Sequence, residues 1–350
     1  MKYLYALLIL APIAVIAEHM HAKPIIVFAL ACLAILPLSG VLGHATEELA
    51  GHTGPTIGGL LNATLGNLAE LIIAALALRA GLIDLVKASI TGSILGNLLL
   101  VLGAAQFAGG LKHRTQKFNP HLAGMSAALL VIAVIGLVIP ALFHLSHPDP
   151  LRVATARMSD WVAGLLILGY GLSLLYSLGT HRAVFGEGGD IATGEAKPHW
   201  SIKKSLGVLV VTAAAIGWLS EILVSSTQEA VKSMGMSEFF VGLILVPIIG
   251  NAAEHSSAVL MAMKNRMDLA VNIAVGSSIQ VALLIAPLLI FMGHAFGRPM
   301  DLAFSTIEVA SVGLAVGIAT VVVLDAESNW LEGAFLLLTY AILGVAFFFF

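Results

Sequence analysis

Charged side chains are scarce in this chain of 350 residues. Asp, Glu, Lys and Arg together make up 11% of it, whereas about a quarter of an average soluble domain is charged. Hydrophobic residues make up 59%. This composition excludes an ordinary soluble domain and indicates an integral membrane protein.

Cysteine is almost absent, and so is any concentration of positive charge. The single Cys32 excludes an internal disulfide and a CxxC metal site. The net charge of −3 is spread over short connections, which excludes the basic patch that nucleic-acid binding needs. The sequence also lacks HExxH and Walker-type motifs, so we expect neither hydrolytic chemistry nor a resident cofactor.

Long apolar runs are what the chain has instead. A membrane-spanning helix needs roughly 20 apolar residues, and on this measure the chain contains about eleven. The predicted fold class is therefore an all-α, polytopic membrane protein. A cleaved signal peptide is the alternative for the first run. The predicted spans are 3–18, 24–43, 55–79, 86–108, 121–145, 158–179, 204–226, 237–262, 268–292, 302–324 and 329–349.

A long polar connection after the sixth helix divides the chain. Its glycines and Pro198 suit a flexible linker. We expect a transmembrane helix at 1–20, a first repeat at 24–180, a central loop at 181–203 and a second repeat at 204–350. Ten Lys and Arg residues fall on the side of the N-terminus and seven on the other. This bias places the N-terminus and the central loop in the cytoplasm and the C-terminus outside.

The repeats are visible in the sequence itself. Residues 66–70 read GNLAE and residues 250–254 read GNAAE, an offset of 254 − 70 = 184 that holds without a gap from Gly58 to Ser93. Each repeat contains five predicted helices, and this odd number makes equivalent helices cross the membrane in opposite directions. Inverted repeats of this kind are typical of secondary transporters.

Each repeat places a carboxylate, Glu70 or Glu254, within an apolar span. Such a residue costs a few kcal/mol and usually faces a cavity or a partner. The structural alternative is a glutamate that is paired with a base or held protonated. Each asparagine precedes its glutamate by three residues and shares its helix face, and the glycine before it permits a broken backbone. The candidate site comprises Gly66, Asn67, Glu70, Ser93 and Asn97 in the first repeat and Gly250, Asn251, Glu254, Ser277 and Gln280 in the second.

This set offers only oxygen ligands, which suits a hard cation such as calcium. Without a cation, two nearby glutamates repel each other and bind protons more readily. Protons and the cation would then compete for the same oxygens, as antiport requires. The expected partners are calcium ions, protons and the lipid bilayer. A homo-oligomer is left open.

Two long segments resemble the signature repeats of the cation/proton exchanger family, within the calcium/cation antiporter superfamily. They are NATLGNLAELIIAALALRAGLIDLVKASITGSILGNLLLVLG at 62–103 and PIIGNAAEHSSAVLMAMKNRMDLAVNIAVGSSIQVALLIAP at 247–287. The resemblance implies that Glu70 and Glu254 bind the exchanged ion, with the asparagines in support and the polar residues of the next helices facing them. It also implies calcium export against a proton gradient. The short N-terminus and weakly acidic loop suggest a prokaryotic cell membrane.

Three further residues have possible roles near the site. Glu48 and Glu229 could line vestibules that attract cations, or they could be solvated helix ends. His255 could assist proton release, because histidine titrates near neutral pH, or it could be a packed side chain. The alternative functions are sodium/calcium exchange and a passive cation channel.

Overall fold

The structure is a computed structural model that describes residues 6–147, 152–181, 198–235 and 237–349. Helices dominate this part of the chain. Its β structure is one antiparallel pair, β1 (Thr115–Lys117) and β2 (Glu327–Asn329). The predicted all-α membrane fold is confirmed.

Among the described residues, helix occupies every predicted span. Within the described residues, nine helices are long and apolar enough to cross a membrane, and one bent pair gives up to ten. The apolar helix Leu7–His19, in the first predicted span, is shorter than the others. The exact count of about eleven therefore stays a prediction.

The chain forms two compact units that cut across the predicted repeats. The first unit comprises residues 1–89 and 190–253, and the second comprises 90–189 and 254–350. Each unit therefore combines a part of the first repeat with a part of the second. The repeat bounds stay a prediction.

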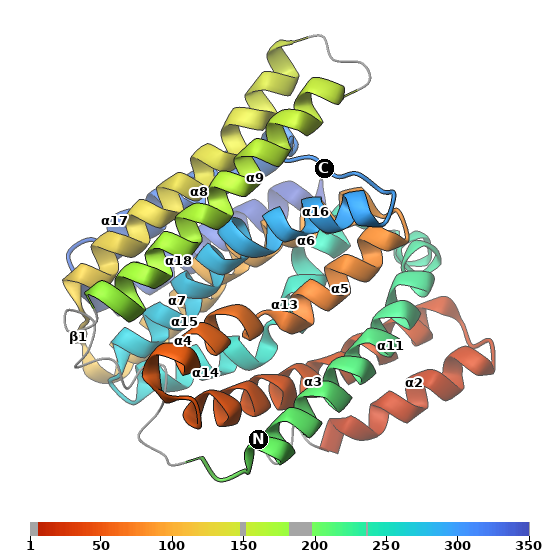
Figure 1. The fold of residues 1–350 in the computed structure, drawn as a ribbon, viewed down its shortest axis with the longest axis horizontal. Coiled ribbons are helices and arrows are strands. Elements are labelled where there is room, and N and C mark those ends of the chain that lie inside the picture. The colour runs from red at the N-terminus through yellow and green to blue at the C-terminus, as the bar shows by residue number, and fades with distance from the viewer. Residues whose placement is uncertain (1–5, 148–151, 182–197, 236, 350) are drawn as a thin grey trace. The chain divides into compact units, whose positions relative to one another are not determined.

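In the first unit, α3 and α11 form the most extensive helix pair. The start of α11 lies beside the end of α3, because the Trp200 N–H donates to Glu48 Oε2 at 2.8 Å. The two helices pack along their lengths in opposite directions (Figure 1). The elements of this unit are η1 (Leu7–Ile9), α2 (Leu10–His19), α3 (Pro24–Gly51), α4 (Gly54–Leu65), α5 (Leu68–Arg79), most of α6 (Ile83–Leu95), α11 (Ile202–Met234), α12 (Glu238–Phe240), η5 (Val241–Leu245) and α13 (Val246–Gly250).

The second unit continues α6 and contains most of α14. Its elements are η2 (Gly96–Val101), α7 (Leu102–His113), β1, α8 (Pro120–Ser146), α9 (Val153–Leu174), η3 (Leu175–Thr180), α14 (Ala252–Met263), α15 (Met267–Gln280), η6 (Val281–Ile285), α16 (Ala286–Ala295), α17 (Thr306–Val323), β2 and α18 (Trp330–Phe348). In this unit α7 packs on α18, α16 packs on α9, and α8 packs on α17. Suppose that α7, α8 and α9 correspond in order to α16, α17 and α18. The contact of α7 with α18 then corresponds to that of α16 with α9, and the contact of α8 with α17 corresponds to itself.

The loops at one end of the second unit are tied together by hydrogen bonds. Lys112 Nζ donates to the Met263 carbonyl at 2.9 Å, and Gln116 Nε2 donates to Asn265 Oδ1 at 2.9 Å. Across the strand pair, Lys117 lies 2.8 Å from Glu327, and this contact raises the pKa of Lys117. The loops after α7, α14 and α17 therefore lie on one side, as the span order predicts.

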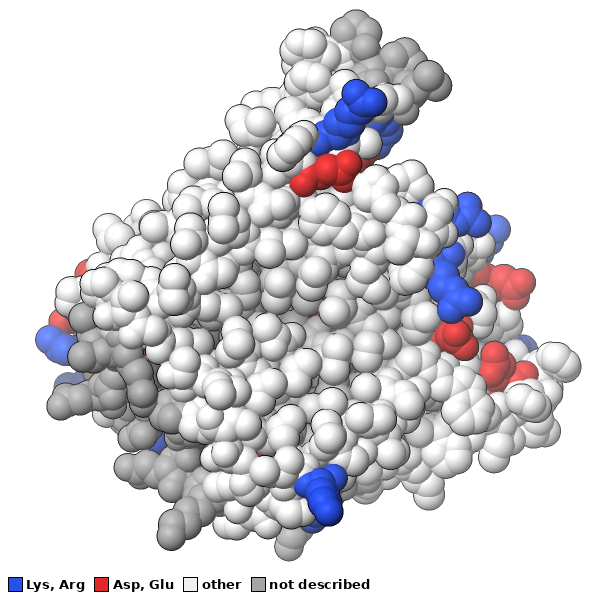
Figure 2. Space-filling view, viewed as in Figure 1, with Lys and Arg blue, Asp and Glu red and all other residues white. Residues whose placement is uncertain are grey.

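The outer surfaces of α8 and α9 are apolar and exposed. Ile135 and Leu142 on α8 and Leu165 on α9 are each more than half exposed. Along these two helices the visible surface carries charge only near the end where they are joined (Figure 2). Large exposed aliphatic side chains without charges suit contact with lipid tails.

Candidate functional site

Both GNxxE segments interrupt a helix at their asparagine. Asn67 lies between α4 and α5 with φ −96° and ψ 23°, and Asn251 lies between α13 and α14 with φ −106° and ψ 7°. These angles depart in the same way from those of an α-helix. The repeated sequence therefore produces a repeated local conformation.

Each interruption places a glutamate in the first turn of a helix. Glu70 lies in the first turn of α5, and Glu254 lies in the first turn of α14. The start of a helix carries a partial positive charge and free N–H groups, which stabilise a nearby carboxylate. The local fold thus reduces the cost of an ionised glutamate within an apolar span.

In the first unit, the two GNxxE segments meet at Glu70. Asn251 Nδ2 donates a hydrogen bond to Glu70 Oε1. Gly250 packs against the same side chain, because a Cβ atom added there would lie 3.3 Å from Glu70 Cγ. The glycine and asparagine of the second segment therefore contact the glutamate of the first.

In the second unit, the polar residues of the following helices also pair across the repeats. Asn97 Nδ2 donates to Ser277 Oγ at 3.0 Å. Both side chains are buried, as is Ser93. Buried amide and hydroxyl groups within apolar helices need hydrogen-bond partners. The oxygens of these two side chains are also suitable ligands for a cation.

Wide helical turns occur at matching places in this unit. The π-helical segment η2 begins at Gly96 and contains Asn97, and η6 directly follows Gln280. Shifting 96–101 by 184 residues gives 280–285, which overlaps η6 almost completely. Segments of this kind are frequent at functional sites.

The ten candidate residues thus form two sets. The first unit holds Gly66, Asn67, Glu70, Gly250 and Asn251, and the second holds Ser93, Asn97, Glu254, Ser277 and Gln280. The structure brings Glu70 together with Gly250 and Asn251, and Asn97 with Ser277. The union of both sets in one cation site stays a prediction.

Glu48 anchors the start of α11. It is buried, and its Oε2 accepts the hydrogen bond from Trp200 N. The Trp200 carbonyl lies 2.6 Å from His52 Nε2, and Lys204 Nζ lies 4.3 Å from the centre of the Trp200 ring. These contacts give Glu48 a structural role, while its vestibule role stays a prediction.

The other two secondary candidates differ in exposure. Glu229 is exposed on α11. His255 is half-buried on α14, and its Nε2 atom is buried without a hydrogen bond to any described residue. Their roles also stay predictions.

Another buried carboxylate, Glu308, was not predicted from the sequence. Glu308 caps the start of α17 through Ser305, and its Oε1 accepts a hydrogen bond from Thr91 Oγ1 at 3.2 Å. Thr91 lies on α6, two residues before Ser93. The capping signature Ser-x-x-Glu at 305–308 could have revealed the cap, but not the contact with α6.

The sequence profile of the sodium/calcium exchanger protein family matches residues 23–179 and 204–349. The chain belongs to this family. Its fold also matches solved exchangers. The native structure of YfkE superposes with a TM-score of 0.86 at 38% identity, covering 99% of this chain and all of that one. An H⁺/Ca²⁺ exchanger, CAX, shares the fold with a TM-score of 0.77 at 15% identity, covering 99% of this chain and 92% of that one.

Several curated relatives of this chain are antiporters, and the similarity extends over nearly the full length of each. The chain is 43% identical to a Ca(2+)/H(+) antiporter of Aphanothece halophytica, covering 99% of this chain and 96% of the relative. It is 42% identical to the Ca(2+)/H(+) antiporter ChaA of Bacillus subtilis, covering 96% of each. The resemblance to cation/proton exchangers is thereby confirmed, and the protein is a multi-pass membrane transporter rather than an enzyme.

Proposed function

We propose that the protein exchanges calcium for protons by alternating access at one site that contains Glu70 and Glu254. The hydrogen bond from Asn251 to Glu70 is the observation that carries this proposal. It joins a residue of the second GNxxE segment to the carboxylate of the first. The relatives in Aphanothece and Bacillus are Ca(2+)/H(+) antiporters, which supports calcium and protons as the exchanged ions.

The donor set supports calcium as the cation. Calcium prefers about 6 to 8 oxygen ligands in flexible geometry. Carboxylate oxygens come from Glu70 and Glu254, and amide and hydroxyl oxygens come from the pair Asn97 and Ser277. In secondary transporters, backbone carbonyls at interrupted helices coordinate cations, and the helices are interrupted at Asn67 and Asn251.

Competition at these carboxylates supplies the coupling. Two glutamates near each other in a poorly hydrated site are costly when both are ionised, so protons neutralise them when calcium leaves. Calcium reverses this balance when it binds. The same oxygens then hold either calcium or protons, and each exposure to one side of the membrane exchanges them.

The internal symmetry supports an alternating mechanism. The antiparallel helices α3 and α11 each begin one of the two predicted repeats. With α7, α8 and α9 matched in order to α16, α17 and α18, the helix contacts of the second unit map onto themselves. The family profile matches one range in each half of the chain. Inverted repeats that exchange conformations around a central site are a recurring basis of secondary transport.

The bacterial relatives favour a prokaryotic cell membrane. We place the N-terminus and the central loop in the cytoplasm and the C-terminus outside, on the distribution of Lys and Arg. Residues 182–197 of that loop lie outside the described residues.

Purified protein in vesicles with an acidic interior is expected to take up calcium as protons leave. The measurement is uptake of radioactive calcium, repeated with manganese, magnesium and sodium under the same pH gradient. A proton ionophore should abolish uptake. Uptake that persists with the ionophore and follows a sodium gradient would instead identify a sodium/calcium exchanger, and passive unitary currents would identify a channel.

Gly250→Ala is expected to weaken calcium binding several-fold without unfolding the protein. The new methyl group would lie 3.3 Å from Glu70 Cγ, so the carboxylate must move by a few tenths of an ångström. Metal sites depend on ligand positions within about 0.2 Å. Equilibrium calcium binding measures the effect. Gly43→Ala is the matched control, because nothing lies within 4 Å of its added Cβ. Equal binding by both variants would contradict the role of Gly250.

A further inference from the structure

A buried carboxylate that the proposed exchange does not use lies at the start of α17. Glu308 is 4% exposed, and it has no ion pair with another described residue. Its Oε2 atom accepts hydrogen bonds from the Ser305 N–H at 2.8 Å and from the Ser305 hydroxyl at 2.7 Å. Its Oε1 atom accepts one from the Thr91 hydroxyl on α6 at 3.2 Å. One carboxylate therefore binds both the start of its own helix and a second helix.

Capping alone does not require this arrangement. A second capping box begins α18, where the Asn329 N–H donates to Glu332 Oε2 at 3.2 Å. Glu332 is only half-buried, and it has no hydrogen bond to another helix among the described residues. A buried carboxylate costs free energy unless charge-assisted hydrogen bonds offset its desolvation. The bond to Thr91 is thus the feature that distinguishes Glu308 from an ordinary capping residue.

Thr91 lies on the side of α6 that is turned away from the candidate site residues. Successive residues of an α-helix are about 100° apart, so Ser93 is roughly 200° from Thr91 around the helix. Asn97 follows Ser93 by four residues and shares its face. Glu308 therefore holds α6 from the face opposite to Ser93 and Asn97.

The site face of the same chain segment is bound by another helix. Asn97 lies in η2, which continues α6, and it donates to Ser277 Oγ on α15 at 3.0 Å. The helix α17 that carries Glu308 also packs on η2. Hydrogen bonds to α15 and to α17 thus restrict the rotation of α6 from two sides.

We propose that Glu308 is a positioning residue for calcium, which acts through Thr91 to fix the rotation of α6 and so to place Ser93 and Asn97 at the cation. The proposal rests on the proposed function, in which these two side chains belong to the site. At about 5 Å from the helix axis, where side chains lie, a turn of about 5° moves an oxygen by about 0.4 Å. Metal sites depend on ligand positions within about 0.2 Å. Even a small rotation of α6 would therefore weaken calcium binding.

Thr91→Val tests the bond without touching the capping box of α17. It removes the hydroxyl at nearly constant volume, and it should raise the KM for calcium in proton-driven uptake several-fold, up to about tenfold, the equivalent of one lost hydrogen bond. The maximal rate should be unchanged. The dissociation constant for calcium, measured without a pH gradient, should rise in parallel with KM. Thr91→Ser keeps the hydroxyl and should keep both constants normal.

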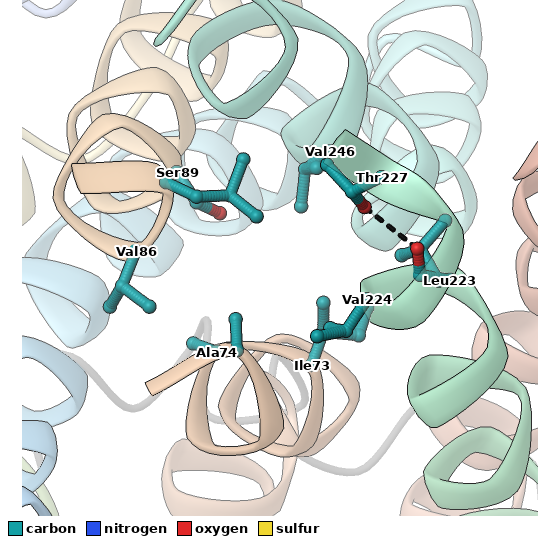
Figure 3. A pocket seen from close by; sticks show the side chains of 10 residues that line it. Ile73, Ala74, Val86, Ser89, Leu223, Val224, Thr227 and Val246 are labelled. Carbon is teal, nitrogen blue, oxygen red and sulfur yellow. Dashed lines mark hydrogen bonds between the residues drawn. The ribbon is translucent and has the colours of Figure 1, made fainter. Parts of the chain in front are cut away.

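Glu308→Ala should raise the KM at least as much as Thr91→Val. Adding Thr91→Val to it should change the KM no further, because the two residues act through one bond. Glu332→Ala is the matched control for the lost cap. Ser89→Ala is the control for a lost hydroxyl on α6, because Ser89 lines a small cavity of the first unit and has no hydrogen bond to another described residue (Figure 3). Both controls should have a normal KM.

An unchanged KM in Thr91→Val would overturn the proposal even if the unfolding temperature falls, because a purely structural bond affects stability alone. Additive effects of Thr91→Val and Glu308→Ala in the double variant would also overturn it. If Glu308→Ala does not fold, Thr91→Val and Thr91→Ser decide alone. Failure of the proposed function gives a different pattern, in which the unaltered protein takes up no calcium under the pH gradient.

Discussion

Glu70→Gln is expected to abolish proton-driven calcium uptake, with a loss of more than about a hundredfold. Replacing a residue that only supports a metal ligand lowers metal affinity or activity about ten- to a hundredfold. Replacing a charged ligand itself should lower uptake by more than that. Glutamine keeps the oxygen that accepts the hydrogen bond from Asn251, so the local fold should persist. It removes the charge that binds calcium and the group that binds the proton. Uptake into acid-loaded vesicles measures the loss.

Glu254→Gln should have the same effect, because Glu254 occupies the equivalent place in the first turn of α14. Glu327→Gln is a suitable control, since it removes only a surface pair with Lys117 at the strands. Undiminished transport by both site variants would refute the two-glutamate site. Loss of transport in the control would show that the assay responds to charge in general.

Gly333→Ala is expected to destabilise the fold by about 3 kcal/mol or more, the upper end of the range for overpacking. Gly333 lies where α18 crosses α7, and its added Cβ would lie 2.3 Å from Phe107 N and 2.6 Å from Gly103 O. These are backbone atoms, so the clash moves a whole helix rather than one side chain. Small residues are used in membranes for such close crossings. Thermal unfolding in detergent measures the change.

Gly344→Ala provides the control on the same helix. Nothing lies within 4 Å of its added Cβ, and alanine is the better helix former by up to about 1 kcal/mol. We therefore expect unchanged or slightly higher stability. Equal unfolding temperatures for the two variants would show that α7 and α18 do not depend on this close crossing.

The sequence by itself determined the fold class and the residues of interest. Apolar runs of membrane length, the offset of 184 residues and the two glutamates are local or periodic features, and they can be read without coordinates. The helix breaks at Asn67 and Asn251 also follow from local sequence. The physical reason is that helix length, helix face and backbone interruption depend on neighbours a few residues away.

Only the tertiary structure decided which residues meet. It pairs Asn251 with Glu70, although they lie in different repeats, and it binds Glu48 to Trp200 at the start of α11. It also places the carboxylate of Glu308 against Thr91 on α6. Such pairs depend on how distant helices pack, and an apolar run that is long enough to span a membrane does not specify its neighbours. Side-chain size and close helix approach select them, and these act only in the folded protein.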